Sequence, residues 1–402
     1  MLLRHLHIGP LKGRGGPNSY LSILRLAYDT YGTTSHEVSF VDIAGIRPIQ
    51  SVDEKQLPDL LKLEHLPSGR LMHVMLGSWI HTLAIRLTSL PRTAADELFD
   101  CDLLFVHNVI LAGRLAHLNP DMARRKLVLV PHSPKYLSHE VSAELIDGEE
   151  QDIYLDPVVR QFTSYEISVM NSVRAVLWPS IGSQDGYENW AHDEGANRSI
   201  IVPTCTPSLT RETYCHELRA KWGVTNDQKM ALFMGRPHPH KGFAFFVELA
   251  RYAKSHVKNE WVFIHAGSAP RKYSDLMSVD HVGYVFQRAA AYAEADLVLI
   301  CNQHTFMDLG LLEAMSLGAS IAVSPTGGHR EILEHCPALT PIPLKSSFET
   351  TWDVLRASGS ANRDRAVIES QIRCWEGSYS LRHFIPYYES AANDLLDGKF
   401  AC

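Results

Sequence analysis

Residues 295–318 have the sequence ADLVLICNQHTFMDLGLLEAMSLG, and this stretch contains both patterns that decide the fold. Its apolar run 295–301 is typical of a buried strand, and Leu309–Leu317 is predicted to form a helix. Similar apolar runs, bounded by Gly, Pro, Asn or His, recur at 2–9, 37–45, 102–108, 126–133, 175–180, 199–204, 230–236, 261–267 and 319–325. Helix-like stretches lie between them, at Ser19–Tyr31, Val159–Val173, Ala244–His256 and Ser347–Ala357. The alternation predicts an α/β protein with doubly wound parallel sheets and right-handed crossovers.

The length of the chain, 402 residues, favours two domains that each bury a core of their own. We expect the boundary near residue 205, because the segment from Pro203 to Thr225 begins with Pro, Thr and Ser before a polar helix. The predicted division is an N-terminal domain at 1–205, a second domain at 206–362 and C-terminal helices at 363–402. The aromatic side chains of these last helices need a surface to pack on, and crossing back to the first domain would supply one.

Composition excludes several classes of protein. A net charge of −7 disfavours a nucleic-acid binder, whose phosphate contacts normally require a basic excess. Seven cysteines without CxxC or zinc-like spacing indicate reduced thiols and no metal site. The first ten residues, MLLRHLHIGP, hold too short an apolar run for a signal peptide, and no stretch of 18 apolar residues occurs. We therefore expect a cytoplasmic protein, with peripheral contact at the inner face of a membrane left open.

A glycine-rich segment, GRGGPNS at 13–19, lies between the first predicted strand and a helix that Asn18 or Ser19 can cap. Gly15 and Gly16 would let backbone N–H groups approach a phosphate at the helix N-terminus. The alternative is a tight turn that binds no ligand. The segment alone does not choose between the two.

A second motif, FMGRPHPHKGF at 233–243, follows a predicted strand directly. Arg236 can contact a diphosphate through its two-pronged guanidinium, and Lys241 can contact it as a point charge. The alternative is that both are solvated loop cations.

The third motif is the helix start within residues 301–318. Helix N-terminal amides between Asp308 and Leu311 would face a ligand at the carboxyl edge of the sheet. Glu313 is surrounded in sequence by apolar residues, so a solvated position is difficult for it. A buried carboxylate needs hydrogen-bond donors, and a ribose supplies two hydroxyl groups.

Together these motifs resemble the donor domain of the retaining glycosyltransferases of family 4. The resemblance runs from Ala231 to Glu334 and rests on three features in order: GR before KG at 235–242, EAM before a glycine at 313–318, and PTGG before a glutamate at 325–331. It reaches the first half more weakly, through Gly15-Gly16, Pro131-His132 and WPS at 178–180. It implies the GT-B architecture, in which two Rossmann-like domains face each other across a cleft.

The resemblance also implies roles for single residues. Arg236 and Lys241 would bind and stabilise the leaving diphosphate, an electrostatic role that replaces a metal ion, and Glu313 would accept the ribose hydroxyls. His132 would face the donor sugar or the acceptor, although it can also be a structural histidine at a strand end. The residues that would complete the donor site are Gly15, Gly16, Gly310 and Leu311.

The activity implied is transfer of a sugar, with retention of configuration, from a nucleotide diphosphate sugar to a hydroxyl acceptor. The donor would be UDP- or GDP-linked, no cofactor or metal would be needed, and the acceptor would be a carbohydrate or glycolipid. The context implied is assembly of a bacterial surface polysaccharide or glycolipid. A nucleotide-sugar epimerase of the same fold, or a catalytically silent partner that binds sugar nucleotides, remain alternatives.

The sequence departs from the family pattern at two positions. Thr305 stands where the family has the first of two glutamates, the one that contacts the donor sugar. Asp308 stands in place of a glycine, and Gly310 follows two positions later. We therefore expect the donor sugar to be held differently, with Asp308, His304 or backbone amides supplying the missing contacts.

Overall fold

The computed structural model describes residues 1–8, 11, 16–32, 36–43, 90, 92–140, 155–191, 195–209, 217–257, 260–269, 277–361 and 364–399. The chain divides into two compact units. Unit 1 comprises Met1–Pro179, Gln184–Val202 and Ile385–Cys402, and unit 2 comprises Ser180–Ser183 and Pro203–Phe384. Unit 2 thus includes seven residues, Ser180–Ser183 and Pro203–Cys205, from the range we assigned to the first domain, and the C-terminal helices are divided between the units.

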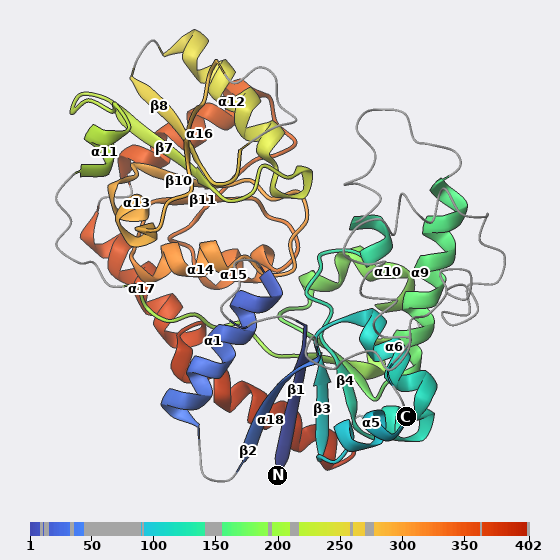
Figure 1. The fold of residues 1–402 in the computed structure, drawn as a ribbon. Coiled ribbons are helices and arrows are strands. Elements are labelled where there is room, and N and C mark those ends of the chain that lie inside the picture. Colours follow the sequence, from blue (N-terminus) through green and yellow to red (C-terminus); the bar gives the residue numbers. More distant parts are fainter. Residues whose placement is uncertain are drawn as a thin grey trace. The chain divides into compact units, whose positions relative to one another are not determined.

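Unit 1 contains a six-stranded parallel sheet with the order β2-β1-β3-β4-β5-β6 (Figure 1). The strands are β1 (Leu2–His7), β2 (Glu37–Asp42), β3 (Leu103–Val106), β4 (Leu127–Leu129), β5 (Ala175–Trp178) and β6 (Ser199–Ile201). Every residue of β3, β4 and β5 is buried. Continuous apolar runs form these strands because a parallel sheet with helices on both faces exposes neither face to water.

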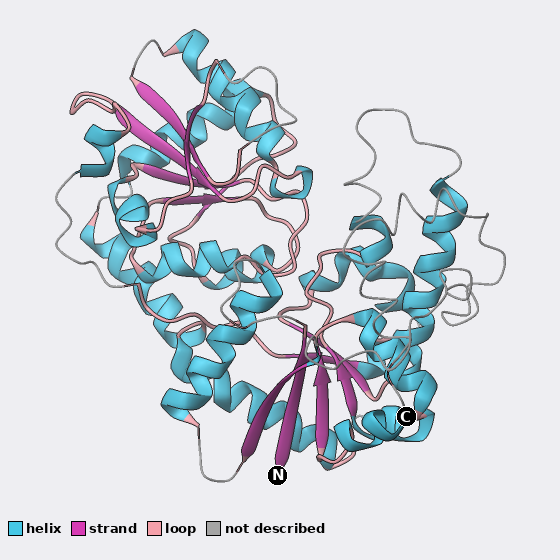
Figure 2. Cartoon of the chain, viewed as in Figure 1, coloured by secondary structure: helices cyan, strands magenta, loops and turns pink. Residues whose placement is uncertain are grey.

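The described helices of unit 1 flank this sheet (Figure 2). They are α1 (Gly16–Tyr31), α5 (Arg92–Leu98), α6 (Val109–Leu118), α7 (Pro120–Lys126), α9 (Leu155–Ser172), α10 (Glu188–Ala191) and α18 (Phe384–Leu396), with 3₁₀ turns at Gly182–Tyr187 and Ala196–Arg198. Helix α18 packs beside β1 and β3 (Figure 1), where the Tyr388 ring lies 5.4 Å from the Phe105 ring. The aromatic tail therefore has its packing surface.

One local prediction for α1 was wrong. The helix begins at Gly16, so Asn18 and Ser19 lie inside its first turn and do not cap it. The first turn accepts Pro17 because the missing N–H has no partner within the helix at that position.

Unit 2 contains the second six-stranded parallel sheet, with the order β12-β11-β10-β7-β8-β9. The strands are β7 (Lys229–Met234), β8 (Trp261–Ala266), β9 (Asp280–Gly283), β10 (Leu297–Ile300), β11 (Ile321–Val323) and β12 (Thr340–Pro341). The two edge strands, β9 and β12, were not predicted. Their sequences, DHVG and TP, lack an apolar run, and each has exposed residues.

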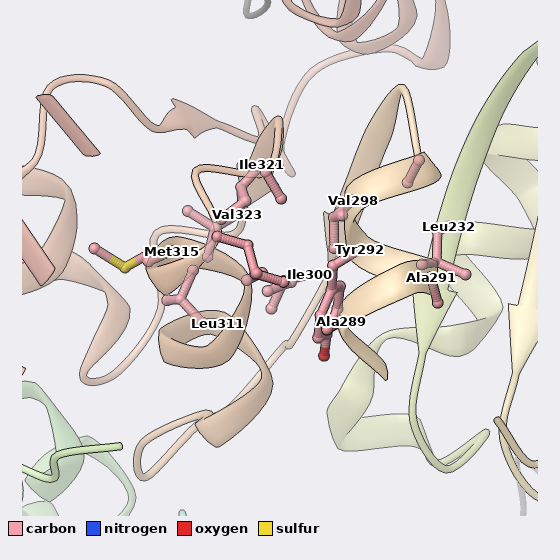
Figure 3. Close-up of a cluster of buried hydrophobic side chains, with 14 of the residues drawn as sticks. Leu232, Ala289, Ala291, Tyr292, Val298, Ile300, Leu311, Met315, Ile321 and Val323 are labelled. Carbon is pink, nitrogen blue, oxygen red and sulfur yellow. The ribbon is translucent and has the colours of Figure 1, made fainter. Parts of the chain in front are cut away.

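The helices of unit 2 also flank their sheet. They are α11 (Glu217–Lys221), α12 (Phe243–His256), α13 (Arg288–Glu294), α14 (Leu309–Ser316), α15 (His329–His335), α16 (Phe348–Ala361) and α17 (Arg365–Ser378), with 3₁₀ turns at Pro239–Lys241 and Leu381–His383. Leu311 and Met315, one helical turn apart on α14, are fully buried. Figure 3 shows them in one apolar cluster with Ile300 and Val323 of the sheet and Tyr292 of α13.

Both units are doubly wound α/β layers, as the alternation of patterns predicted. In each sheet all strands are parallel, so the loops after the strands gather at one edge.

Candidate active site

Two loops of unit 2 meet at the carboxyl edge of its sheet. One follows β7 and the other follows β10, and these strands are neighbours in the sheet. The amide of Gln303 donates to the carbonyl of His240 at 2.8 Å, which joins the loops directly. The second and third sequence motifs, far apart in the chain, therefore come together.

Gly242 explains how closely the loops approach. Its φ of 70° lies in the left-handed region, and a Cβ at this position would collide with the carbonyl group of Cys301. Only glycine accommodates both constraints without strain. Because Gly242 follows Lys241 immediately, this contact brings the lysine against the loop that leads into α14.

Lys241 is paired with Asp308. The lysine Nζ lies 2.7 Å from Oδ2 of the aspartate, and the two side chains are only 26% and 15% exposed. Asp308 is also the N-cap of α14, because its Oδ1 accepts the amide of Gly310 at 3.0 Å, and Asn302 donates to its Oδ2 at 2.9 Å. Burial alone would raise the pKa of Asp308, but Lys241, His329 and the Asn302 hydrogen bond outweigh it and hold that pKa below its usual range. The structure therefore holds an ionised carboxylate where the family pattern has a glycine.

The helix-start amides are already hydrogen-bonded. Gly310 donates its N–H to the Asp308 side chain and Leu311 donates to the Asp308 carbonyl at 3.1 Å. Leu311 itself points into the apolar core. In this structure, then, the two amides that we assigned to the phosphate cradle cap their own helix.

Glu313 is buried, as we predicted, with an exposed fraction of 6%. Its Oε1 accepts a charged hydrogen bond from Arg288, the first residue of α13, whose side chain is half-exposed. Burial raises the pKa of Glu313, and Arg288 opposes that rise without cancelling it. The donor that satisfies this carboxylate in the structure is therefore a guanidinium, and the ribose role stays a prediction.

Thr305, at the position of the missing glutamate, is buried in the loop before α14. A Cβ on Gly327 would meet the carbonyl oxygen and Cγ2 of Thr305, so the two residues are packed together. The threonine thus lies against the turn formed by the PTGG segment, and it leaves no exposed acceptor comparable to a glutamate.

The glutamate after the PTGG segment has a structural contact. Oε1 of Glu331 accepts the amide of Gly182 at 2.7 Å. Gly182 also lies against the carbonyl of Gly327, where a Cβ would collide. This part of the motif therefore holds the segment Ser180–Ser183 within unit 2.

Three site residues were predicted in unit 1: Gly15, Gly16 and His132. Gly15 lies outside the described residues, and Gly16 is the first residue of α1. His132 has a left-handed φ of 61°, and its Nε2 lies 2.7 Å from Nδ1 of His107, whose Nε2 lies 3.1 Å from Nδ1 of His5. His5 lies in β1, whereas His107 and His132 lie in the segments that follow β3 and β4. Burial lowers the pKa of His132 and of His5 to about 3, so the chain is neutral near pH 7.

Arg236, the other predicted phosphate ligand, lies exposed in the loop after β7. Among the described residues, no hydrogen bond or ion pair holds its guanidinium in place. It is therefore available to an anionic ligand, in contrast to Lys241.

Residues 228–343 match the family model described as glycosyl transferases group 1. An uncharacterized glycosyltransferase of Methanocaldococcus jannaschii is 29% identical over 126 residues, which cover 29% of this chain and 32% of that protein. The match thus spans about a third of the relative's length.

Residues 228–343 belong to the group 1 glycosyltransferases.

Solved structures extend the likeness of the glycosyltransferase segment to the whole fold. Sucrose-phosphate synthase from Thermosynechococcus elongatus has a TM-score of 0.68 at 14% identity, covering 99% of both chains. HepE from Anabaena, solved with UDP-glucose, has a TM-score of 0.64 at 16% identity, covering 99% of this chain and 100% of the other. WaaG, a glycosyltransferase involved in lipopolysaccharide biosynthesis, has a TM-score of 0.62 at 16% identity over 99% and 100%. The two Rossmann-like units are those of the GT-B fold.

Two features are absent from the part of the chain that the structure describes. None of its described helices combines the length and the apolar character needed to cross a bilayer. Within the same residues, no group of three or more His, Cys, Asp or Glu side chains is arranged to hold a metal ion.

Sequence reasoning missed three residues of the site. Arg288 was missed because it follows β9, an edge strand without an apolar run. Asn302 was missed because an amide after a strand carries no signal of its own. His329, fully buried at the start of α15, donates from Nδ1 to the Ser324 carbonyl at 3.1 Å, while its Nε2 has no hydrogen-bond partner among the described residues. Its place directly after the PTGG segment was the available signal.

Proposed function

We propose that the protein transfers a sugar from a nucleoside diphosphate sugar to a hydroxyl acceptor with retention of anomeric configuration. The observation that carries this proposal is the junction of the two loops in unit 2. It brings the cations Arg236 and Lys241 to the same sheet edge as the buried carboxylate of Glu313, inside the segment that matches the group 1 glycosyltransferases.

In the proposed reaction the bond between the anomeric carbon and the diphosphate oxygen breaks, and its electron pair leaves with the diphosphate. Arg236 and Lys241 stabilise this negative charge as it develops. Such electrostatic stabilisation of the transition state is usually the largest single contribution to catalysis. The acceptor hydroxyl attacks the same face, and its proton passes to an oxygen of the departing diphosphate. Because the leaving group accepts the proton, no carboxylate nucleophile is required.

Glu313 would accept the two ribose hydroxyls of the donor. Two hydroxyls can replace the hydrogen bond that Arg288 now donates, and the half-exposed guanidinium can turn into water at small cost. The exchange keeps the buried carboxylate hydrogen-bonded throughout.

We further propose a UDP- or GDP-linked donor and a carbohydrate or glycolipid acceptor, in the assembly of a bacterial surface polysaccharide. HepE was solved with UDP and with UDP-glucose, and WaaG acts in lipopolysaccharide biosynthesis, which supports this choice by analogy. A glycolipid acceptor would bring the protein to a membrane surface.

A catalytically silent sugar-nucleotide-binding partner is the second candidate. Two observations favour it: Thr305 replaces the glutamate that contacts the donor sugar, and Lys241 is already neutralised by Asp308. Such a protein would bind the donor without turning it over.

A binding screen followed by product analysis tests these proposals. The affinity for UDP, GDP and their sugars is measured by calorimetric titration with EDTA present. A true ligand at 100 times its dissociation constant should also raise the free energy of unfolding by about 2.7 kcal/mol. NMR of the products then gives the anomeric configuration. Binding that requires a divalent ion contradicts the metal-free scheme, and an inverted glycoside contradicts retention. A released, epimerised nucleotide sugar would identify an epimerase, and binding without turnover across an acceptor panel would favour the silent partner.

A further inference from the structure

Two of the three charged residues on which the proposed donor site depends already hold partners within the chain. Glu313 is paired with Arg288, and Lys241 is paired with Asp308 across 67 positions of sequence. The second pair concerns the diphosphate, because the ammonium that should hold the anion is held by another anion. The pair also departs from the family pattern, which has a glycine at position 308.

Three donors fix the Asp308 carboxylate in place. Oδ1 accepts the Gly310 amide, and Oδ2 accepts Asn302 at 2.9 Å and Lys241 at 2.7 Å. A carboxylate with this many donors stays ionised. Both carboxylate oxygens of Asp308 are therefore already occupied, which disfavours the contact with sugar hydroxyls that we predicted for this residue. Its negative charge acts mainly on Lys241.

A diphosphate bound to Lys241 would stand next to this ionised carboxylate. The three N–H groups of the ammonium can contact both anions at once, but the repulsion between the anions remains. Like charges brought together at a poorly solvated site oppose binding strongly. His240 and His329 face the same pair, and burial lowers their pKa values to about 3 and about 4, so neither adds a compensating charge near pH 7.

We propose that Asp308 is an internal counter-ion that competes with the donor diphosphate for Lys241 and thereby weakens the hold on the nucleoside diphosphate product. The inference rests on the proposed function and deepens it, because it assigns the competing residue within the donor site. A neutral residue at 308 removes the repulsion and leaves Lys241 without its internal partner. Both effects act in the same direction, toward tighter binding of the diphosphate.

The proposal has a kinetic consequence: tighter binding of the nucleoside diphosphate slows its release. In many transferases the departure of product limits turnover, so a site that binds the nucleoside diphosphate more tightly releases it more slowly. Neutralising Asp308 should therefore lower both the KM for the donor and kcat. A merely structural loss at this position would raise KM instead.

The test is a double-mutant cycle measured by calorimetry with UDP and with GDP. Asp308→Asn keeps the shape of the side chain and, as a good N-cap, the hydrogen bond from Gly310. We expect it to bind the preferred nucleotide at least about 10-fold more tightly than the wild type. Lys241→Met should bind it more weakly, and in that variant Asp308→Asn should relieve only the repulsion between the two anions, so it should tighten binding less than it does when Lys241 is present.

Two further variants complete the design. Glu369→Gln removes one negative charge from an exposed pair with Arg365 on α17 and should leave affinity within 2-fold, which separates the local effect from a change in net charge. Asp308→Gly, the residue of the family pattern, replaces Asp308→Asn if thermal melting shows that the asparagine variant does not fold. Wild-type binding together with unchanged or weaker binding by the folded 308 variant overturns this inference alone. Failure of the wild type to bind either nucleotide overturns the proposed function, and the inference with it.

Discussion

Nδ1 of His107 lies 2.7 Å from Nε2 of His132, and this contact is one link of a three-histidine chain across the first sheet. The inner end, His5, is fully buried between the rings of Phe40 and Phe105 at 5.0 and 4.8 Å. A neutral imidazole donates at one nitrogen and accepts at the other, so the tautomer of each ring fixes that of the next. His107 therefore orients His132, the residue that the family resemblance assigns to the reacting end of the site.

The histidine chain predicts acid sensitivity. In the unfolded chain these imidazoles take up protons near pH 6.5, whereas burial lowers the pKa of His5 and His132 to about 3 and also lowers the pKa of His107, next to His132. The stability that they contribute is complete above pH 6.5 and is lost as the pH falls toward 3. His107→Phe should reduce stability at pH 8 by roughly 1–3 kcal/mol, because two hydrogen bonds lose a partner.

The same variant should also flatten the acid profile, because one titrating group is gone. Urea unfolding followed from pH 8 to pH 5 measures both effects, with the slope giving the protons taken up on unfolding. An unchanged slope in His107→Phe would mean that His107 is protonated in the folded protein.

Lys241→Ala should lower turnover by roughly 100-fold, in the range found when one preorganised electrostatic group is removed. The structure adds a second effect, because the substitution leaves the Asp308 carboxylate poorly exposed and without its cation. We therefore expect a lower melting temperature as well as a lower kcat.

The double variant Lys241→Ala/Asp308→Asn separates these two effects. Removing the orphaned charge should restore most of the melting temperature, because a neutral asparagine side chain avoids the desolvation cost of an unpaired ion. Turnover should stay low. If turnover returns together with stability, Lys241 supports the fold and does not contact the diphosphate.

Glu313→Gln keeps the shape of the side chain and removes the charge that would accept two ribose hydroxyls. Nucleotide affinity should fall by roughly 1–3 kcal/mol, measured by calorimetry. Arg288→Gln provides the matched test of ionisation. Arg288 now holds down a pKa that burial raises, so its loss should raise the pKa of Glu313 further and move the acid limb of nucleotide binding to higher pH. Unchanged affinity in a folded Glu313→Gln variant would assign Glu313 to the pairing with Arg288 alone.

The parallel architecture could be predicted because it depends on local patterns. Buried strands such as β3 and β10 are continuous apolar runs, and amphipathic helices separate many of them. Edge strands could not be predicted in this way, since β9 buries little and its sequence, DHVG, has no apolar run. The helix after it, α13, was missed for the same reason, and with it Arg288.

The residues of the donor site could be named from the sequence, but their pairing could not. Lys241 and Asp308 meet because Gly242 lets one loop rest against Cys301 of the next, a contact that appears only once the sheet is assembled. Burial of Glu313 followed from its apolar neighbours, whereas the identity of its partner required the position of α13.

Thr305 carries the last prediction, because it replaces a residue that the family uses to hold the donor sugar. Its Cγ2 and carbonyl lie against Gly327, and the side chain is 6% exposed, so a glutamate at this position would place a carboxylate in a nearly dry site. We expect Thr305→Glu to reduce stability by roughly 1–3 kcal/mol and to lower activity with the native donor. Thermal melting and initial rates with saturating donor measure the two effects.

Thr305→Val and Thr305→Ala separate the contribution of the Thr305 hydroxyl group from that of its methyl group. Valine keeps the packing of Cγ2 against Gly327 and removes only the hydroxyl, so any loss in donor affinity, expected at about 0.5–1.5 kcal/mol, belongs to one neutral hydrogen bond. Alanine removes the packing as well and should be the less stable of the two. If Thr305→Glu instead raises activity with the native donor, the buried site accommodates the carboxylate, and the threonine is a degenerate catalytic position. That result would favour the silent sugar-nucleotide-binding partner, because the wild-type chain would then lack a group that its own site can use.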